Sequence, residues 1–101
     1  MEVWLLEEFS TWLSSLRDAR ARVKITARLT RLSLGNAGDV AAVGEGVSEM
    51  RINFGPGYRI YYFQHGSVLA IVVGGGDKST QDADIKRALS LARQWKQENA
   101  S

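Results

Sequence analysis

Hydrophobic and polar residues alternate along the middle of the chain in three short runs that turn residues separate. The first two runs cover residues 49–54 and 58–64, with Gly55-Pro56-Gly57 between them. Proline has a fixed φ and no amide donor, and glycine tolerates positive φ, so this tripeptide predicts a hairpin turn. His65-Gly66 marks a second turn, and the run 67–73 that follows is apolar on both faces. The pattern predicts three antiparallel strands, the last of them central in a sheet.

The same alternation predicts what lies on each face of the sheet, because every second side chain of a strand points the same way. Met50, Ile52 and Ile60 then share a face that can cover a core. The opposite face gathers the polar and basic side chains of the first two strands, which are Arg51, Asn53, Arg59 and Tyr61. Lys78 follows just beyond the end of the third strand. We therefore expect one solvent-facing, cationic hollow on this side.

Before these strands, apolar residues recur at helical spacing. Residues 3–6 form a short apolar run that predicts an edge strand or a second-layer strand. Glu7 and Glu8 then open a helix, where negative charge suits the helix dipole. The apolar face of that helix comprises Phe9, Trp12, Leu13 and Leu16. Asp18 is a candidate N-cap for a second helix over residues 19–34. Its predicted buried positions are Ala21, Ile25, Leu29 and Leu32.

After a small polar stretch, residues 40–43 allow one further short strand or an extended arm. A last helix is expected after Ser79, which can cap it with Asp82 at the capping-box position, and it should run to about residue 97. Its apolar stripe consists of Ile85, Leu89, Ala92 and Trp95. Strands and helices come in groups rather than in alternation, which predicts an α+β fold with a mainly antiparallel sheet, two N-terminal helices and a C-terminal helix. A length of 101 residues fits a single domain, 1–101.

Composition restricts the available chemistry. The chain has no cysteine and one histidine, His65, which lies in a predicted turn. We therefore expect no disulfide, no metal site, no cofactor and no Ser/His/Asp triad. Gly74-Gly75-Gly76 lacks the ending of a phosphate-binding P-loop, so a strand end that needs close backbone packing is the simpler interpretation. No apolar run is long enough for a membrane span and no signal peptide is evident, so a cytoplasmic protein is expected.

Charge is unevenly distributed although the net charge is only +2. The second predicted helix region carries six cations against one acid, Asp18; the cations are Arg17, Arg20, Arg22, Lys24, Arg28 and Arg31. Such a row is most often a solvated surface. The functional alternative is attraction to a polyanion, with Arg20, Lys24, Arg28 and Arg31 as RNA-binding candidates, or to an acidic partner helix.

The strand cations suggest a phosphate site. Arg51, Arg59 and Lys78 could surround a phosphate, since guanidinium donors match phosphate oxygens in pairs. Tyr61 could stack on a base or donate a hydrogen bond, and Asp77 could assist proton transfer. RNA cleavage by its own 2′-hydroxyl needs only alignment and stabilisation of the added negative charge. The competing interpretation is that both arginines are ordinary cross-strand residues that pair with acids such as Glu49.

The motifs resemble those of the RelE/ParE superfamily of toxins, in particular its HigB-like "addiction module killer" branch. The resemblance is carried by Ser48-Glu49-Met50-Arg51-Ile52, Gly57-Tyr58-Arg59-Ile60-Tyr61-Tyr62 and Gly75-Gly76-Asp77-Lys78-Ser79. It implies a small RelE-like fold and a toxin neutralised by a cognate antitoxin, a HigA-like helix-turn-helix protein encoded beside it. It also implies a metal-independent endoribonuclease that cuts mRNA on the ribosome.

Carried over by position, the resemblance assigns Arg51, Arg59 and Lys78 to the catalytic site. Asp77 lies near the place where some HigB relatives have an acid, and Asn53 stands where some relatives have a second basic residue. The ParE branch shares the fold but poisons DNA gyrase, so two activities remain open, as does an inactive toxin-fold binding protein.

Overall fold

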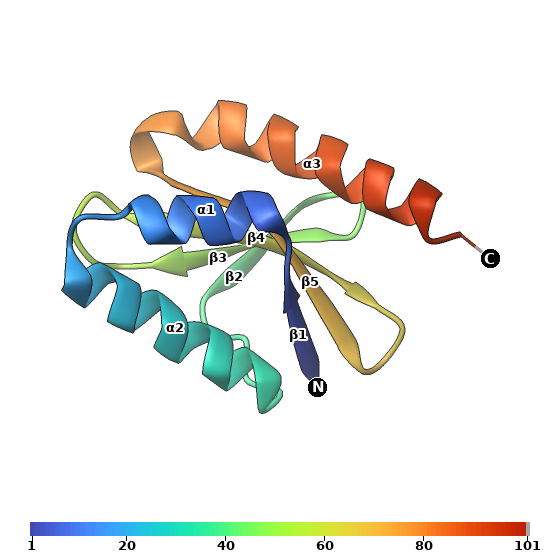
Figure 1. The fold of residues 1–101 in the computed structure, drawn as a ribbon, viewed down its shortest axis with the longest axis horizontal. Helices are drawn as coiled ribbons and strands as arrows, with labels where there is room; N and C mark the ends of the chain where they lie inside the picture. The colour runs from blue at the N-terminus through green and yellow to red at the C-terminus, as the bar shows by residue number, and fades with distance from the viewer. Residues whose placement is uncertain (101) are drawn as a thin grey trace.

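Residues 1–100 are described by a computed structural model, in which five strands form one sheet and three helices pack against it (Figure 1). The strands are β1 (Glu2–Leu5), β2 (Val40–Gly44), β3 (Val47–Ile52), β4 (Tyr58–His65) and β5 (Leu69–Asp77). The helices are α1 (Glu7–Ser15), α2 (Ala19–Ser33) and α3 (Gln81–Glu98), with a 3₁₀ turn over Lys78–Thr80. The sheet order is β1-β5-β4-β3-β2, and only the β1–β5 pair is parallel. This is the α+β class expected from the sequence.

One face of the sheet packs against α1 and α2. Phe9 of α1 and the predicted stripe of α2 are buried there with Met50, Ile60 and Val72 of the sheet; that stripe comprises Ala21, Ile25, Leu29 and Leu32. The Asp18 side chain caps α2 by accepting the backbone N–H of Arg20 at 2.9 Å, as expected. The helical periodicity of the N-terminal half therefore identified this core layer correctly.

The other face of the sheet packs against α3, so both faces are covered; Figure 1 shows α2 and α3 on opposite sides of the sheet. Ala88 and Ala92 of α3 are buried against Val47, Phe63 and Val73, and Ile85, Leu89 and Trp95 are partly buried beside them. Because α3 covers this face, much of what the alternation placed toward solvent lies beneath a helix.

The start of α3 differs from the expected capping box. Asp77, not Ser79, is the capping residue, and it begins the 3₁₀ turn that precedes α3. Thr80 stands at the N-cap of α3 and makes no side-chain cap bond. The physical reason is that β5 continues through the glycines to Asp77, which moves the strand-to-helix turn by a few residues.

Position 75 in β5 requires glycine, because a side chain there would collide with α1. A Cβ built on Gly75 would lie 2.4 Å from Cε3 of Trp12, which is well inside contact distance. The expectation that these glycines allow close backbone packing is confirmed at this position. No helix within residues 1–100 is both long and apolar enough to cross a bilayer.

Candidate nucleic-acid interface

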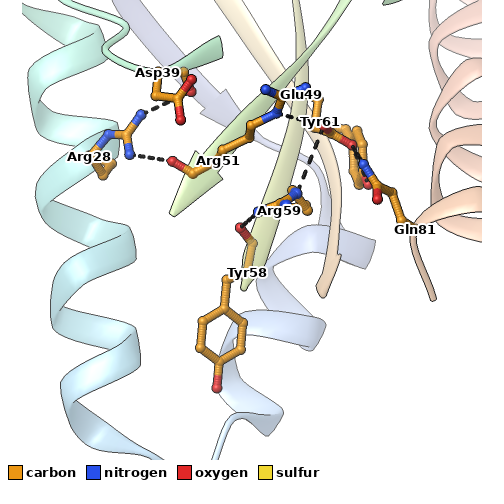
Figure 2. A network of polar contacts seen from close by, with 8 residues as sticks. All are labelled: Arg28, Asp39, Glu49, Arg51, Tyr58, Arg59, Tyr61 and Gln81. Carbon is orange, nitrogen blue, oxygen red and sulfur yellow. Dashed lines mark hydrogen bonds and ion pairs between the residues drawn. The ribbon is translucent and has the colours of Figure 1, made fainter. Parts of the chain in front are cut away.

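The two strand arginines lie directly opposite each other on β3 and β4, on the face that α3 covers. Arg51 Nε donates a hydrogen bond of 3.3 Å to Oε1 of Glu49, and Arg59 Nε forms an ion pair of 3.8 Å with the same oxygen (Figure 2). Two cations at facing positions repel each other unless an anion compensates them. Glu49 supplies that anion and holds both guanidinium groups close together.

Glu49 is only 1% exposed, and its second carboxylate oxygen is also engaged. Oε2 accepts the hydroxyl of Tyr61 at 3.1 Å and the amide of Gln81, at the start of α3, at 2.8 Å. A carboxylate is costly to bury unless it is paired and hydrogen-bonded, and here both conditions are met. The strands and α3 therefore share one polar cluster, which we call the Glu49 cluster: Glu49, Arg51, Arg59, Tyr61 and Gln81 (Figure 2).

The two arginines of the Glu49 cluster differ in exposure. The Arg51 side chain is 44% exposed, whereas that of Arg59 is 12% exposed. Arg59 Nη1 donates to the carbonyl of Tyr58 at 3.3 Å, but its buried Nε has no hydrogen-bond partner among residues 1–100. This N–H lies 3.8 Å from Oε1 of Glu49, so it takes part in the ion pair but is too far away for a hydrogen bond.

Lys78 lies next to Arg59 at the end of the hairpin. Gly57, in the β3–β4 turn, has φ +80°, and a Cβ built there would lie 3.5 Å from Cβ of Lys78 and 3.7 Å from Nη1 of Arg59. Lys78 itself is exposed. The predicted cations Arg51, Arg59 and Lys78 are thus brought together, with Gly57 leaving space between them.

Tyr61 does not have the exposure that base stacking requires, which corrects the sequence-based expectation. Its ring is fully buried under α3, and its hydroxyl is bound to Glu49. Burial raises the pKa of Tyr61 well above its ordinary value, and the neighbouring Glu49 carboxylate raises it further. Tyr61 therefore supports Glu49 from within the protein by donating its hydroxyl hydrogen to the carboxylate.

Asp77 lies at the end of β5, opposite Tyr58 and one position from the residue that pairs with Arg59. It accepts the backbone N–H of Ser79 at 2.8 Å and the Ser79 hydroxyl at 2.5 Å. These bonds hold the pKa of Asp77 below its usual value. A carboxylate with a lowered pKa is a weak proton acceptor at neutral pH. In the structure the Asp77 side chain caps the 3₁₀ turn.

The side chains of the remaining predicted RNA-binding residues do not take part in the side-chain contacts of the Glu49 cluster. Asn53 follows the end of β3 and lines a hollow of about 300 Å³ beside α2, together with Lys24 and Arg31. Arg28 is occupied structurally, because it donates to three backbone carbonyls, those of Arg51, Ala37 and Asp39. Two cations of α2 lie over the ring of Phe54. Lys24 Nζ is 5.0 Å from the ring centroid, and the guanidinium carbon of Arg20 is 5.7 Å from it.

The family model described as phage-derived protein Gp49-like matches residues 11–97. The chain belongs to the Gp49-like family. This family is associated with toxin–antitoxin modules. An uncharacterized protein of Haemophilus influenzae is 51% identical over 86 residues, which cover 85% of this chain and 87% of that protein.

Sequence reasoning missed two members of the Glu49 cluster in this Gp49-like chain. From the sequence, Glu49 is expected only as a surface partner for the arginines. In the structure it points to the face opposite Met50 and pairs with Tyr61 across the strands. The strand register that places Arg51 opposite Arg59 also places Glu49 opposite Tyr61, so it could have predicted that the carboxylate lies beside the phenol. Gln81 carries no such signal, because its position depends on how α3 returns over the sheet 32 residues later.

Proposed function

We propose that this Gp49-like protein is the toxin of a toxin–antitoxin module and acts in the cytoplasm as a metal-independent, ribosome-dependent mRNA endoribonuclease. Its cognate antitoxin would be a helix-turn-helix protein of the HigA kind. The observation that supports the activity best is the facing pair Arg51 and Arg59, fixed by one buried carboxylate and joined at the hairpin end by Lys78. The motif resemblance to RelE and HigB toxins supports the choice of RNA.

The chemistry we propose is attack of an RNA 2′-oxygen on the adjacent phosphorus with departure of the 5′-oxygen, which leaves a 2′,3′-cyclic phosphate and a 5′-hydroxyl. Arg51 and the terminal guanidinium nitrogens of Arg59 would bind the non-bridging oxygens, where negative charge increases in the transition state. Lys78 is exposed and would donate the proton that the 5′-oxygen takes up. The proton of the 2′-hydroxyl would pass to water or to a ribosomal group.

Glu49, Tyr61 and Gln81 would act as positioning residues. None of them needs to touch the substrate, since Glu49 and Tyr61 are buried and Gln81 donates inward to Glu49. Their contribution would be to hold the guanidinium groups before the phosphate arrives, so that little reorganisation is needed in the transition state.

The test is brief induction of the chain without an antitoxin, followed by growth measurement and primer extension on total RNA. We expect growth arrest with new mRNA ends at codon positions for the wild type, and loss of both for Arg59→Ala and Arg51→Ala. Arg87→Ala is the matched control, because Arg87 forms an exposed ion pair with Glu8 away from the Glu49 cluster.

Thermal unfolding of each purified variant separates loss of activity from loss of fold. Arg51→Ala is the safer variant, since its side chain is the more exposed of the two. Growth arrest with intact mRNA and a DNA-damage response would replace the proposal with a ParE-like gyrase poison. Normal growth with the wild-type chain would leave only a toxin-fold binding protein.

A further inference from the structure

The hollow beside α2 is a second candidate binding surface, separate from the Glu49 cluster. It lies between α2 and the end of β3, with a volume of about 300 Å³. Four of its eight lining residues are apolar, namely Val23, Ala27, Ile52 and Phe54. Val23 is 69% exposed, which is high for a branched aliphatic side chain beside a concave surface.

Cations also line this partly apolar hollow. Lys24 and Arg31 line it, and neither takes part in any ion pair found within residues 1–100. The helix region contains six cations and one acid, Asp18, and that acid already pairs with Arg20 at 3.5 Å. The ligand that complements this surface must therefore bring negative charge and apolar side chains together.

Nucleic acid meets only the first of these two requirements. Its phosphates would suit Lys24 and Arg31, but base stacking needs a free aromatic face. Phe54 is the aromatic residue of the hollow, and Lys24 and Arg20 already occupy positions over its ring. An RNA backbone would also gain nothing from covering Val23 and Ala27.

An acidic amphipathic helix meets both requirements. Such a segment can place its apolar side chains in a groove and its carboxylates at the rim. We infer that the hollow lined by Val23, Lys24, Ala27, Arg31 and Phe54 is a docking site for an acidic amphipathic segment of a partner protein.

Docking at this hollow would also reach the Glu49 cluster through the β3–β4 turn. Phe54 starts the turn, and Gly57 at its other end lies between Arg59 and Lys78. Arg28 ties α2 to the carbonyl of Arg51 at 2.6 Å. A bound segment is thus placed to hold this turn and restrict access to the arginine pair; only this last consequence rests on the proposed function.

The test is selection of binders from a displayed library of 12-residue peptides on the folded protein. We expect enriched peptides to combine Asp or Glu with Leu, Ile or Phe. Binding of a selected peptide, measured by fluorescence anisotropy, should weaken at least tenfold in Lys24→Glu/Arg31→Glu and in Ala27→Trp, which fills the hollow. The matched controls Lys86→Glu and Ala83→Trp, at exposed positions of α3, should change it less than twofold.

The outcomes separate this inference from the proposed function. Failure to enrich acidic amphipathic peptides, or equal loss of binding in the α3 controls, overturns the docking site. A single-stranded RNA 12-mer that competes with the peptide and loses affinity in Ala27→Trp also overturns it, in favour of RNA. Ala27→Trp should keep the wild-type growth phenotype in the absence of a partner. Peptide selection that succeeds with a non-toxic wild type would refute only the proposed ribonuclease.

Discussion

Glu49 holds the two arginines in place, and removing its charge tests how much the protein depends on it. Glu49→Gln keeps the shape of the side chain but leaves one carbonyl oxygen for donors from Tyr61, Gln81 and Arg51. It also leaves Arg59, only 12% exposed, without its anion. Removing one partner of a buried ion pair costs about 3–5 kcal/mol. We expect about 3 kcal/mol here, because Arg51 is 44% exposed and water can compensate it.

The assay is urea unfolding of the purified variants. A domain of this length has an unfolding free energy of roughly 5–15 kcal/mol, so the variant should stay folded. With an m-value of about 1.5 kcal/mol/M, a loss of 3 kcal/mol lowers the midpoint by about 2 M urea. Arg59→Met should cost about 1 kcal/mol, since Glu49 keeps its bonds from Arg51, Tyr61 and Gln81.

A double-mutant cycle then isolates the interaction. The double variant Glu49→Gln/Arg59→Met should lose at least ~1.5 kcal/mol less than the sum of the single variants, because neither buried charge remains. The control cycle at Glu8 and Arg87, an ion pair with both side chains exposed, should show coupling below about 1 kcal/mol. Additivity within about 0.5 kcal/mol at Glu49 and Arg59 would refute the reasoning.

Two further predictions concern β5. Gly75→Ala should destabilise the protein by about 1–3 kcal/mol through overpacking against Trp12. Gly74→Ala should cost little, because no atom lies within 4 Å of its added Cβ. The urea midpoints of the two variants compare these effects, and equal losses of stability would contradict the steric account. The Ser79 donors lower the Asp77 pKa, so the stability they give is present above its ordinary pKa of 3.8 and is lost as the pH falls through the folded value. Asp77→Asn should therefore show a smaller drop in urea midpoint from pH 5 to pH 2 than the wild type, and an unchanged drop would exclude this role.

Local signals were sufficient for most of the fold. The four buried positions of α2 follow from a 3.6-residue period, and the Gly55-Pro56-Gly57 turn follows from backbone chemistry alone. The facing of Arg51 and Arg59 follows from strand alternation and the short turn between the strands. These features depend on residues close together in the chain, and the sequence therefore predicts them.

The parts that could not be predicted depend on α3. Alternation assigns Tyr61 to the face opposite the α1 and α2 core, but it cannot say whether that face is open or covered. Packing of α3 buries Tyr61 and brings Gln81 onto Glu49. The use of Arg28 on three backbone carbonyls is a similar long-range result, because a charge on a helix surface does not reveal which loop will lie against it.

The central claim is that the arginine pair binds an RNA phosphate, and the Nε–H resonances of Arg51 and Arg59 in ¹⁵N-labelled protein test it most directly. The titrant is a single-stranded RNA tetranucleotide with 2′-O-methyl groups, which cannot be cleaved, at low ionic strength. The account predicts that the Nε–H signals of Arg51 and Arg59 both shift, while that of Arg93, which is paired with Glu45, does not move. An unchanged Arg59 signal, or equal shifts at Arg93, would contradict it.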